Sequence, residues 1–172
     1  MPPNLNLKYG RQQIMKALII YISVHHGNTE RVAKVMANIL DAALLQVKQA
    51  NASMLEQYDL IGFGSGIYFG KHHKSLLDFV DKLPVLRNKK AFIFSTSGLG
   101  KIPFVHNFDK PLRKKLQRKG FDIIGEFSCR GLDTYRATKL VGGVNKGRPN
   151  AEDLRQAEDF ASGLKNSGAS YL

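Results

Sequence analysis

The chain has 172 residues, 43% of them hydrophobic and 23% charged, a composition typical of one folded domain that excludes an intrinsically disordered chain. Lysine and arginine number 26 against 14 aspartate and glutamate residues, so the net charge is +12, and nucleic acid is the first partner that this excess suggests. The single cysteine, Cys129, excludes an internal disulfide and any multi-cysteine metal site, and the short apolar runs exclude a membrane span.

Apolar periodicity predicts strands and helices in alternation. The strands are expected at 16–22, 44–47, 58–64, 90–95 and 121–128, and the helices at 28–40, 74–83, within 104–119, and at 151–164. Asn150 is a plausible cap for the last helix, and Pro111 places the start of the basic helix near Asp109. Continuous apolar strands joined by helical crossovers predict a doubly wound, five-stranded parallel α/β sheet with helices on both faces.

One domain accounts for most of the chain. We expect an N-terminal extension at 1–15, the domain at 16–166 and a C-terminal tail at 167–172, with a long polar, glycine-rich connection at 134–149. The first 15 residues contain no apolar signal-peptide core, so we expect a cytoplasmic protein.

The positive charge is concentrated in the second half of the chain. Residues 1–86 hold 9 basic and 6 acidic side chains, whereas residues 87–172 hold 17 and 8. The densest run, with Asp109 as its only acidic residue, contains Arg87, Lys89, Lys90, Lys101, Lys110, Arg113, Lys114, Lys115, Arg118 and Lys119.

In a doubly wound sheet, ligands bind beyond the carboxyl ends of the strands. The segment there after the first strand is Ser23, Val24, His25, His26, Gly27, Asn28 and Thr29, which leads directly into a helix. Hydroxyl groups and backbone N–H groups at a helix N-terminus form an anion site. The segment lacks both GxGxxG and GK[ST], which favours a phosphate held by neutral donors; the alternative is that it only caps the helix.

Two further small-residue loops follow the third and fourth predicted strands. They are Ser65, Gly66, Ile67, Tyr68, Phe69 and Gly70, and, after Ser95, Thr96, Ser97, Gly98, Leu99 and Gly100. All three loops end on the same edge of the sheet, and these two are suited to form the sides of a slot for a flat ring. A phosphate site beside such a slot predicts a bound mononucleotide.

These segments resemble the phosphate loop and the two ring-binding loops of flavodoxins, and the resemblance covers residues 16–164. It implies a flavodoxin-like fold in three layers with strand order 2-1-3-4-5, and flavin mononucleotide (FMN) as the cofactor. A carbonyl near Gly66 would accept a hydrogen bond from N5–H of the reduced ring.

Three features differ from the usual flavodoxin pattern. His25 and His26 stand where hydroxyl residues are usual, and we expect one of them to contact the FMN phosphate. Tyr68, or alternatively Ile67, is expected at the ring where many relatives have tryptophan. The chain is basic whereas electron-carrying flavodoxins are typically acidic, so the expected reduction potential is less negative than theirs.

The favoured function is electron transfer to or from a redox partner, with the basic run as the docking surface for an acidic partner protein or a small acidic substrate. One alternative is an FMN-dependent oxidoreductase of the quinone reductase, flavin reductase or protoporphyrinogen oxidase type. A remote alternative is a flavin-free domain that binds anions or nucleic acid, although no nucleic-acid-binding motif is present.

Several other residues near this edge have competing interpretations. Cys129 is expected to be a small buried residue rather than a redox thiol, and His72 and His73 to be exposed residues at a helix start. Residues 130–135 are suggested as a lid. No spacing indicates a metal site.

Overall fold

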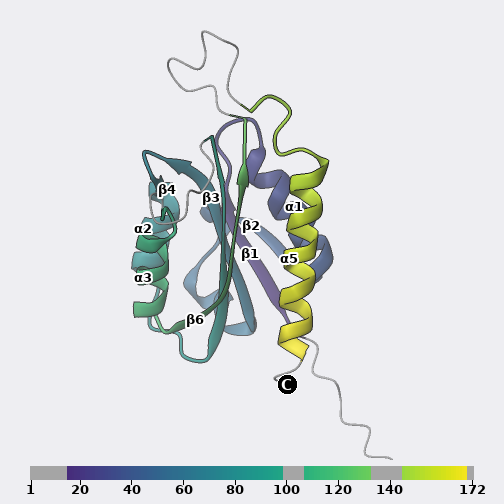
Figure 1. Cartoon of the computed structure of the whole chain (residues 1–172). Coiled ribbons are helices and arrows are strands. Elements are labelled where there is room, and N and C mark those ends of the chain that lie inside the picture. The colour runs from purple at the N-terminus through teal and green to yellow at the C-terminus, as the bar shows by residue number, and fades with distance from the viewer. Residues whose placement is uncertain (1–14, 99–106, 133–144, 170–172) are drawn as a thin grey trace, which may run out of the picture.

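A parallel β-sheet runs through the middle of the protein, with helices on both of its faces (Figure 1). The computed structural model describes residues 15–98, 107–132 and 145–169. The parallel strands are β1 (Ala17–Ile22), β2 (Ala43–Gln46), β3 (Leu60–Tyr68), β5 (Lys89–Ser97) and β6 (Phe121–Arg130), in the order β2-β1-β3-β5-β6. The two-residue β4 (Lys71–His72) pairs antiparallel with the end of β3, off this path. Counted without β4 the order is 2-1-3-4-5, so the predicted fold is confirmed.

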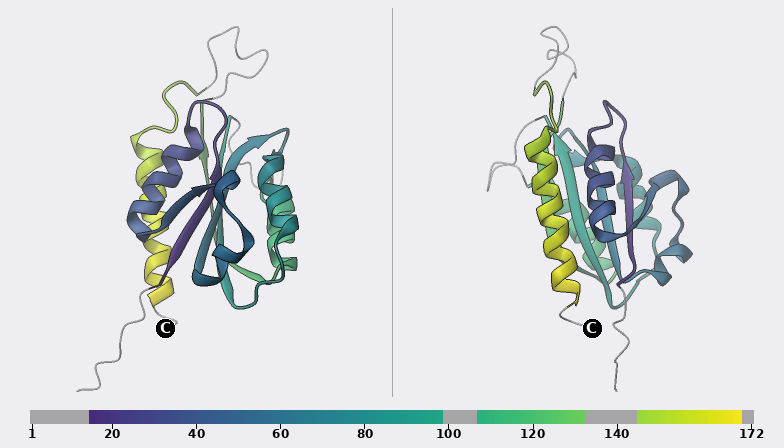
Figure 2. Two further views of the ribbon diagram at one scale, coloured as in Figure 1. Left: turned by 180° about the vertical axis from the view of Figure 1, so that it is seen from behind. Right: turned by 90° about the vertical axis from the view of Figure 1, so that its right-hand side faces the viewer.

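The helices form two layers that are separated by the sheet (Figure 2). Helices α1 (Asn28–Leu40) and α5 (Ala151–Ala169) lie side by side on one face, and α2 (Lys74–Lys82) and α3 (Lys110–Arg118) cover the other. Each face has its own apolar core. Two 3₁₀ turns that the sequence pattern did not predict, Val47–Gln49 and Ala52–Gln57, connect β2 to β3. No helix within the described residues is long and apolar enough to cross a membrane.

Three strands run further toward the carboxyl edge than predicted. β3 continues past residue 64 to Tyr68, β5 past 95 to Ser97, and β6 past 128 to Arg130. The polar and glycine-rich composition there is typical of loops, but pairs such as Gly66 with Thr96 continue the backbone ladder. Helix α5 likewise continues past residue 164 to Ala169, so part of the predicted tail, 167–169, is helical.

Glycines in β3 make room for aromatic rings of the neighbouring strand. Gly62 and Gly64 are paired with Phe92 and Phe94 of β5. A Cβ at Gly62 would lie 2.3 Å from Phe92 Cζ, and one at Gly64 would lie 2.1 Å from Phe94 Cζ. Both phenylalanines are fully buried in the core beneath α1 and α5. The rings therefore lie directly across the β3 backbone, which only glycine permits.

We expect Gly64→Ala to lower the free energy of unfolding by about 1–3 kcal/mol, because the added methyl group would displace a buried ring from a close-packed core. Gly163→Ala in α5 is the matched control, since a Cβ added there would meet no neighbouring atom within 4 Å. It should leave stability unchanged or raise it by up to about 1 kcal/mol. Urea unfolding followed by circular dichroism measures both, and a Gly64→Ala protein as stable as the wild type would contradict this packing.

Candidate functional site

A cavity of about 200 Å³ opens at the carboxyl edge of the sheet. Four segments line it, at the start of α1, the β3–β4 hairpin, the end of β5 and the segment after β6. The predicted site residues that line it are His25, His26, Asn28, Thr29, Gly66, Ile67, Tyr68, Phe69, Thr96, Ser97 and Gly98. The structure thus brings parts of all three predicted loops to one cavity.

The remaining predicted site residues do not line the cavity or are not described. Ser23 and Gly27 lie just before α1, and Val24, which follows Ser23, is half exposed. Ser65 is buried within β3, and Gly70 lies in the turn before β4. Leu99 and Gly100 lie outside the described residues.

The start of α1 leaves hydrogen-bond donors open for an anion. Gly27 is the N-cap in a left-handed conformation, φ 65°, and no side chain in the described part of the chain caps the helix. The hydroxyl of Ser23 is buried, yet among the described residues it has no hydrogen-bond partner, a condition it shares only with the hydroxyl of Ser95. Uncapped N–H groups, the positive end of the helix dipole and an unpartnered hydroxyl together suit a phosphate group.

Buried side-chain bonds hold the first wall of the cavity against the others. The hydroxyl oxygens of Thr29 in α1 and Thr96 in β5 lie 2.8 Å apart. The Asn28 amide donates to the Leu132 carbonyl at 2.8 Å. Gly131 permits this approach, because a Cβ there would lie 2.7 Å from Asn28 Nδ2. These bonds fix the spacing between α1 and the ends of β5 and β6.

The second wall is the β3–β4 hairpin, which the sequence pattern predicted as a loop. Its two-residue turn, Phe69 and Gly70, has positive φ at both positions, as a tight hairpin of this type requires. The Phe69 side chain is 83% exposed. The Tyr68 ring lies over Gly66, because a Cβ added to Gly66 would be 3.0 Å from the ring. The centroids of the Tyr68 and His25 rings are 6.2 Å apart. An aromatic side chain therefore borders the cavity, at the position predicted for a ring contact.

Behind this hairpin is a buried polar cluster that corrects the prediction for His72. Instead of starting a helix in solvent, His72 lies in β4 with a fully buried side chain. Its Nδ1 is 2.8 Å from Ser65 Oγ and its Nε2 is 2.9 Å from Asp109 Oδ1. His73 does precede α2 as its N-cap, and burial together with the nearby His25 lowers its pKa. The sequence contained no signal that would pair residues 65, 72 and 109.

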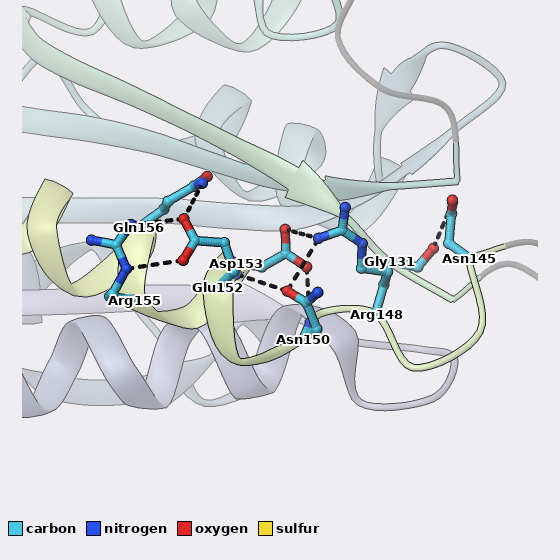
Figure 3. Close-up of polar contacts among 8 residues, drawn as sticks. All are labelled: Gly131, Asn145, Arg148, Asn150, Glu152, Asp153, Arg155 and Gln156. Atoms are coloured by element: carbon cyan, nitrogen blue, oxygen red, sulfur yellow. Dashed lines mark hydrogen bonds and ion pairs between the residues drawn. The ribbon is translucent and has the colours of Figure 1, made fainter.

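The third wall was only partly foreseen. Gly131 and Leu132, from the segment suggested as a lid, line the cavity, whereas residues 133–135 lie outside the described part of the chain. The Asn145 amide donates to the Gly98 carbonyl at 2.6 Å. It also donates to the Gly131 carbonyl at 3.3 Å (Figure 3). Asn145 therefore joins the end of β5 to the segment after β6, a role that its place in a polar connection did not reveal.

The start of α5 anchors this wall. Asn150 Oδ1 accepts from the Asp153 backbone N–H at 3.0 Å, and the Asn150 backbone N–H donates to the Asp153 carboxylate at 2.8 Å (Figure 3). These bonds confirm the predicted cap. Arg148 pairs with the buried Asp153 at 2.7 Å, and its carbonyl accepts from the Leu132 N–H. The capped helix thereby holds Leu132 in place.

Much of the basic run is bonded to the chain itself. Arg113 forms a bidentate ion pair with Glu126, and this hydrogen-bonded pairing raises the pKa of Arg113. Lys115 pairs with Asp81 at 2.6 Å, and the ammonium groups of Lys89 and Lys119 bind backbone carbonyls. The basic side chains of α3 that remain exposed are Lys110, Lys114 and Arg118. They are spaced four residues apart, so they form one stripe along the helix. The predicted docking surface is therefore narrower than the sequence run, and Lys101 lies outside the described residues.

Cys129 is part of the core beneath α1 and α5, and its side chain is buried. Burial, and to a lesser degree the nearby Asp153, raises the pKa of its thiol to about 12. The thiol is thus almost entirely protonated at neutral pH, which favours the structural role over a redox one. Among the described residues, no three histidine, cysteine or acidic side chains are placed to hold a metal ion.

The comparisons with known proteins agree with this geometry. A family model described as a flavodoxin domain matches residues 18–134. An uncharacterized protein of Methanocaldococcus jannaschii is 54% identical over 154 residues, which is 88% of this chain and all of that protein. Two solved structures share the fold. Oxidised Flavodoxin 2 from Bacillus cereus is 20% identical with a TM-score of 0.65, and the match covers 89% of this chain and 98% of that one. A flavodoxin from the domain Archaea is 14% identical with a TM-score of 0.61, and the match covers 91% of this chain and 100% of that one.

We expect native Cys129 to react with a thiol reagent about a thousandfold more slowly at pH 8 than in the unfolded chain. The reactive species is the thiolate, and a pKa of about 12 leaves far less of it than the ordinary value does. Labelling with a disulfide reagent with and without urea measures this ratio. Equal rates would place the thiol in contact with solvent.

Proposed function

The chain belongs to the flavodoxin domain family, and on that premise we propose that it binds FMN in the cavity at the carboxyl edge and transfers electrons with a redox partner. FMN supplies the chemistry of one- or two-electron transfer, and the protein supplies binding, orientation and electrostatics. The proposal depends first on whether this chain's own residues suit the two ends of FMN.

The observation that carries the proposal is at the phosphate end. The Ser23 hydroxyl is buried, has no hydrogen-bond partner among the described residues, and lies just before the N-terminus of α1. A buried polar atom without a partner is costly, and a phosphate oxygen would supply the missing bond. His25 and His26, which border the cavity, would add donors to the phosphate.

The ring end is suited to a flat aromatic group. Tyr68 and Ile67 border the cavity from the hairpin, and Ser97 and Gly98 border it from the end of β5. In the proposed complex the ring lies between these two walls, with backbone groups at its polar edge and Tyr68 as the stacking residue.

The proposed partner is a protein with an acidic docking face. The exposed stripe of Lys110, Lys114 and Arg118 would attract such a face and raise the rate of encounter at low salt. Two exposed apolar side chains near the cavity, Val24 and Phe69, supply contact area that a stripe of charge alone lacks. Phe69 also has a positive φ of 52°, a strained conformation for a bulky residue.

A second candidate is an FMN-dependent oxidoreductase. The observation in its favour is the 83% exposed Phe69 ring beside the cavity, which offers a surface for a second flat molecule such as a quinone. The two candidates share the cofactor site and differ in whether a small substrate turns over.

We expect FMN to bind more tightly than riboflavin, which lacks the phosphate. Ser23→Ala should reduce that preference by about ten- to a hundredfold, because a hydrogen bond to a charged group contributes about 1.5–3 kcal/mol. Flavin fluorescence quenching gives both dissociation constants. Ser53→Ala is the control, since that exposed hydroxyl bonds Asn51 elsewhere on the protein.

Equal affinity for FMN and riboflavin in the wild-type protein would contradict the phosphate assignment. Loss of affinity for both flavins in Ser23→Ala would assign Ser23 a structural role instead.

The carrier and the enzyme are separated by turnover. Enzymes usually turn over at about 1–10³ s⁻¹. We expect the FMN-loaded protein to oxidise NADH or NADPH with a quinone acceptor at a rate well below this range. Steady-state assays at saturating nucleotide measure this rate. Turnover within that range would favour the oxidoreductase.

A further inference from the structure

Three buried side chains behind the β3–β4 hairpin form a continuous hydrogen-bonded relay. Ser65 comes from β3, His72 from β4, and Asp109 immediately precedes α3. The side chains of His72 and Asp109 are 0% exposed, as is Ser65. The relay ends beside the cavity, because Ser65 Oγ also lies 2.8 Å from the carbonyl oxygen of Gly66, a cavity-lining residue.

The Ser65 hydroxyl can bond all three of its polar neighbours only when His72 Nδ1 carries a proton. It accepts from the His73 backbone N–H at 3.0 Å, and it lies 2.8 Å from both the Gly66 carbonyl oxygen and His72 Nδ1. A hydroxyl donates one proton and accepts at two lone pairs. The carbonyl can only accept, so the proton on His72 Nδ1 decides where the Ser65 proton goes.

Each charge state of His72 gives a different bond at Gly66. The Asp109 carboxylate accepts at 2.9 Å, so Nε2 carries a proton in both states. In the charged ring Nδ1–H also donates to Ser65, which then donates to the Gly66 carbonyl. In the neutral ring Nδ1 accepts the Ser65 proton, and the Gly66 carbonyl loses its bond from Ser65.

We propose that the Ser65–His72–Asp109 relay positions the Gly66 carbonyl at the edge of the cavity, and that the proton on His72 Nδ1 decides whether Ser65 holds this carbonyl. The relay concerns the protein alone. Its effect on FMN rests on the proposed function, in which the released carbonyl would accept a bond from N5–H of reduced flavin, a donor that oxidised flavin lacks.

The geometry does not suit hydrolysis, although the residue types are those of a serine hydrolase. Such chemistry needs a serine oxygen that reaches a substrate, whereas Ser65 is fully buried and surrounded by its own backbone. A role in positioning the Gly66 carbonyl accounts for the hydrogen bonds of Ser65, His72 and Asp109.

The charged and titratable groups around the relay come from several elements. Asp109 faces His72 directly, and Arg113 of α3 interacts with Asp109 while it is paired with Glu126 of β6. His73 adjoins His72 but directs its Nδ1 to the Ser75 N–H of α2. The carboxylate of Asp109 is thus the only charge bonded directly to the His72 ring within the described residues.

The relay can be tested without flavin. In NMR spectra of the flavin-free protein, His72→Gln is expected to shift the Gly66 carbonyl carbon, because the imidazole ring no longer fixes the position of the Ser65 proton. In a Ser65→Ala background the same substitution should leave the Gly66 signal unchanged. A Gly66 signal that His72→Gln does not shift, or that it shifts equally in both backgrounds, would overturn the proposal.

The flavin half is tested by the ratio of dissociation constants for oxidised and reduced FMN. This ratio should differ about threefold between the wild type and His72→Gln, an amount expected of one net hydrogen bond. His73→Asn, which keeps an acceptor for the α2 cap, should behave as the wild type. An identical ratio in His72→Gln and the wild type would overturn this half.

These outcomes separate the two proposals. A wild-type protein that binds no FMN contradicts the proposed function, while the NMR spectra of the flavin-free variants still decide the relay. Should His72→Gln not fold, Ser65→Ala removes the link to Gly66 and leaves the buried pair of His72 with Asp109 intact.

Discussion

Strand β3 forms hydrogen-bonded ladders with β1 on one side and β5 on the other, and the candidate site is built where those ladders end. The pairing continues through Ser65 and Gly66, so the backbone at the cavity is held by the sheet and not by a free loop. Phe92 and Phe94 pack across the glycines of β3 in the core beneath α1 and α5. The shape of the cavity therefore depends on the strand pairing at the centre of the sheet.

The sequence was sufficient to predict the architecture because its signals are local. Continuous apolar strands and helical stripes gave the layers, and the segment from Ser23 to Thr29 located the first wall of the cavity. The extra length of β3 was missed because ladder bonds depend on neighbouring strands, whereas composition alone suggested a loop. The same limit applies to Ser65, His72 and Asp109, whose association depends on three segments meeting behind the hairpin. Asn145 could not be assigned for the same reason.

The polar groups near the cavity differ in whether the protein already satisfies them. Thr29 with Thr96, and Asn28 with the Leu132 carbonyl, are bonded pairs that hold the walls together. The Ser23 hydroxyl is buried without a partner in the described part of the chain, and it lies where the α1 N-terminus is uncapped. The net charge of +12 contributes differently: part of it stabilises the fold through pairs such as Arg113 with Glu126, and a stripe on α3 remains for a partner.

The central claim, that this chain holds FMN at the carboxyl edge, is tested most directly by the visible absorption spectrum of the protein after FMN has been added and the excess removed. The account predicts the two absorption bands of oxidised flavin at close to one flavin per chain. A protein that retains no flavin under these conditions would contradict it.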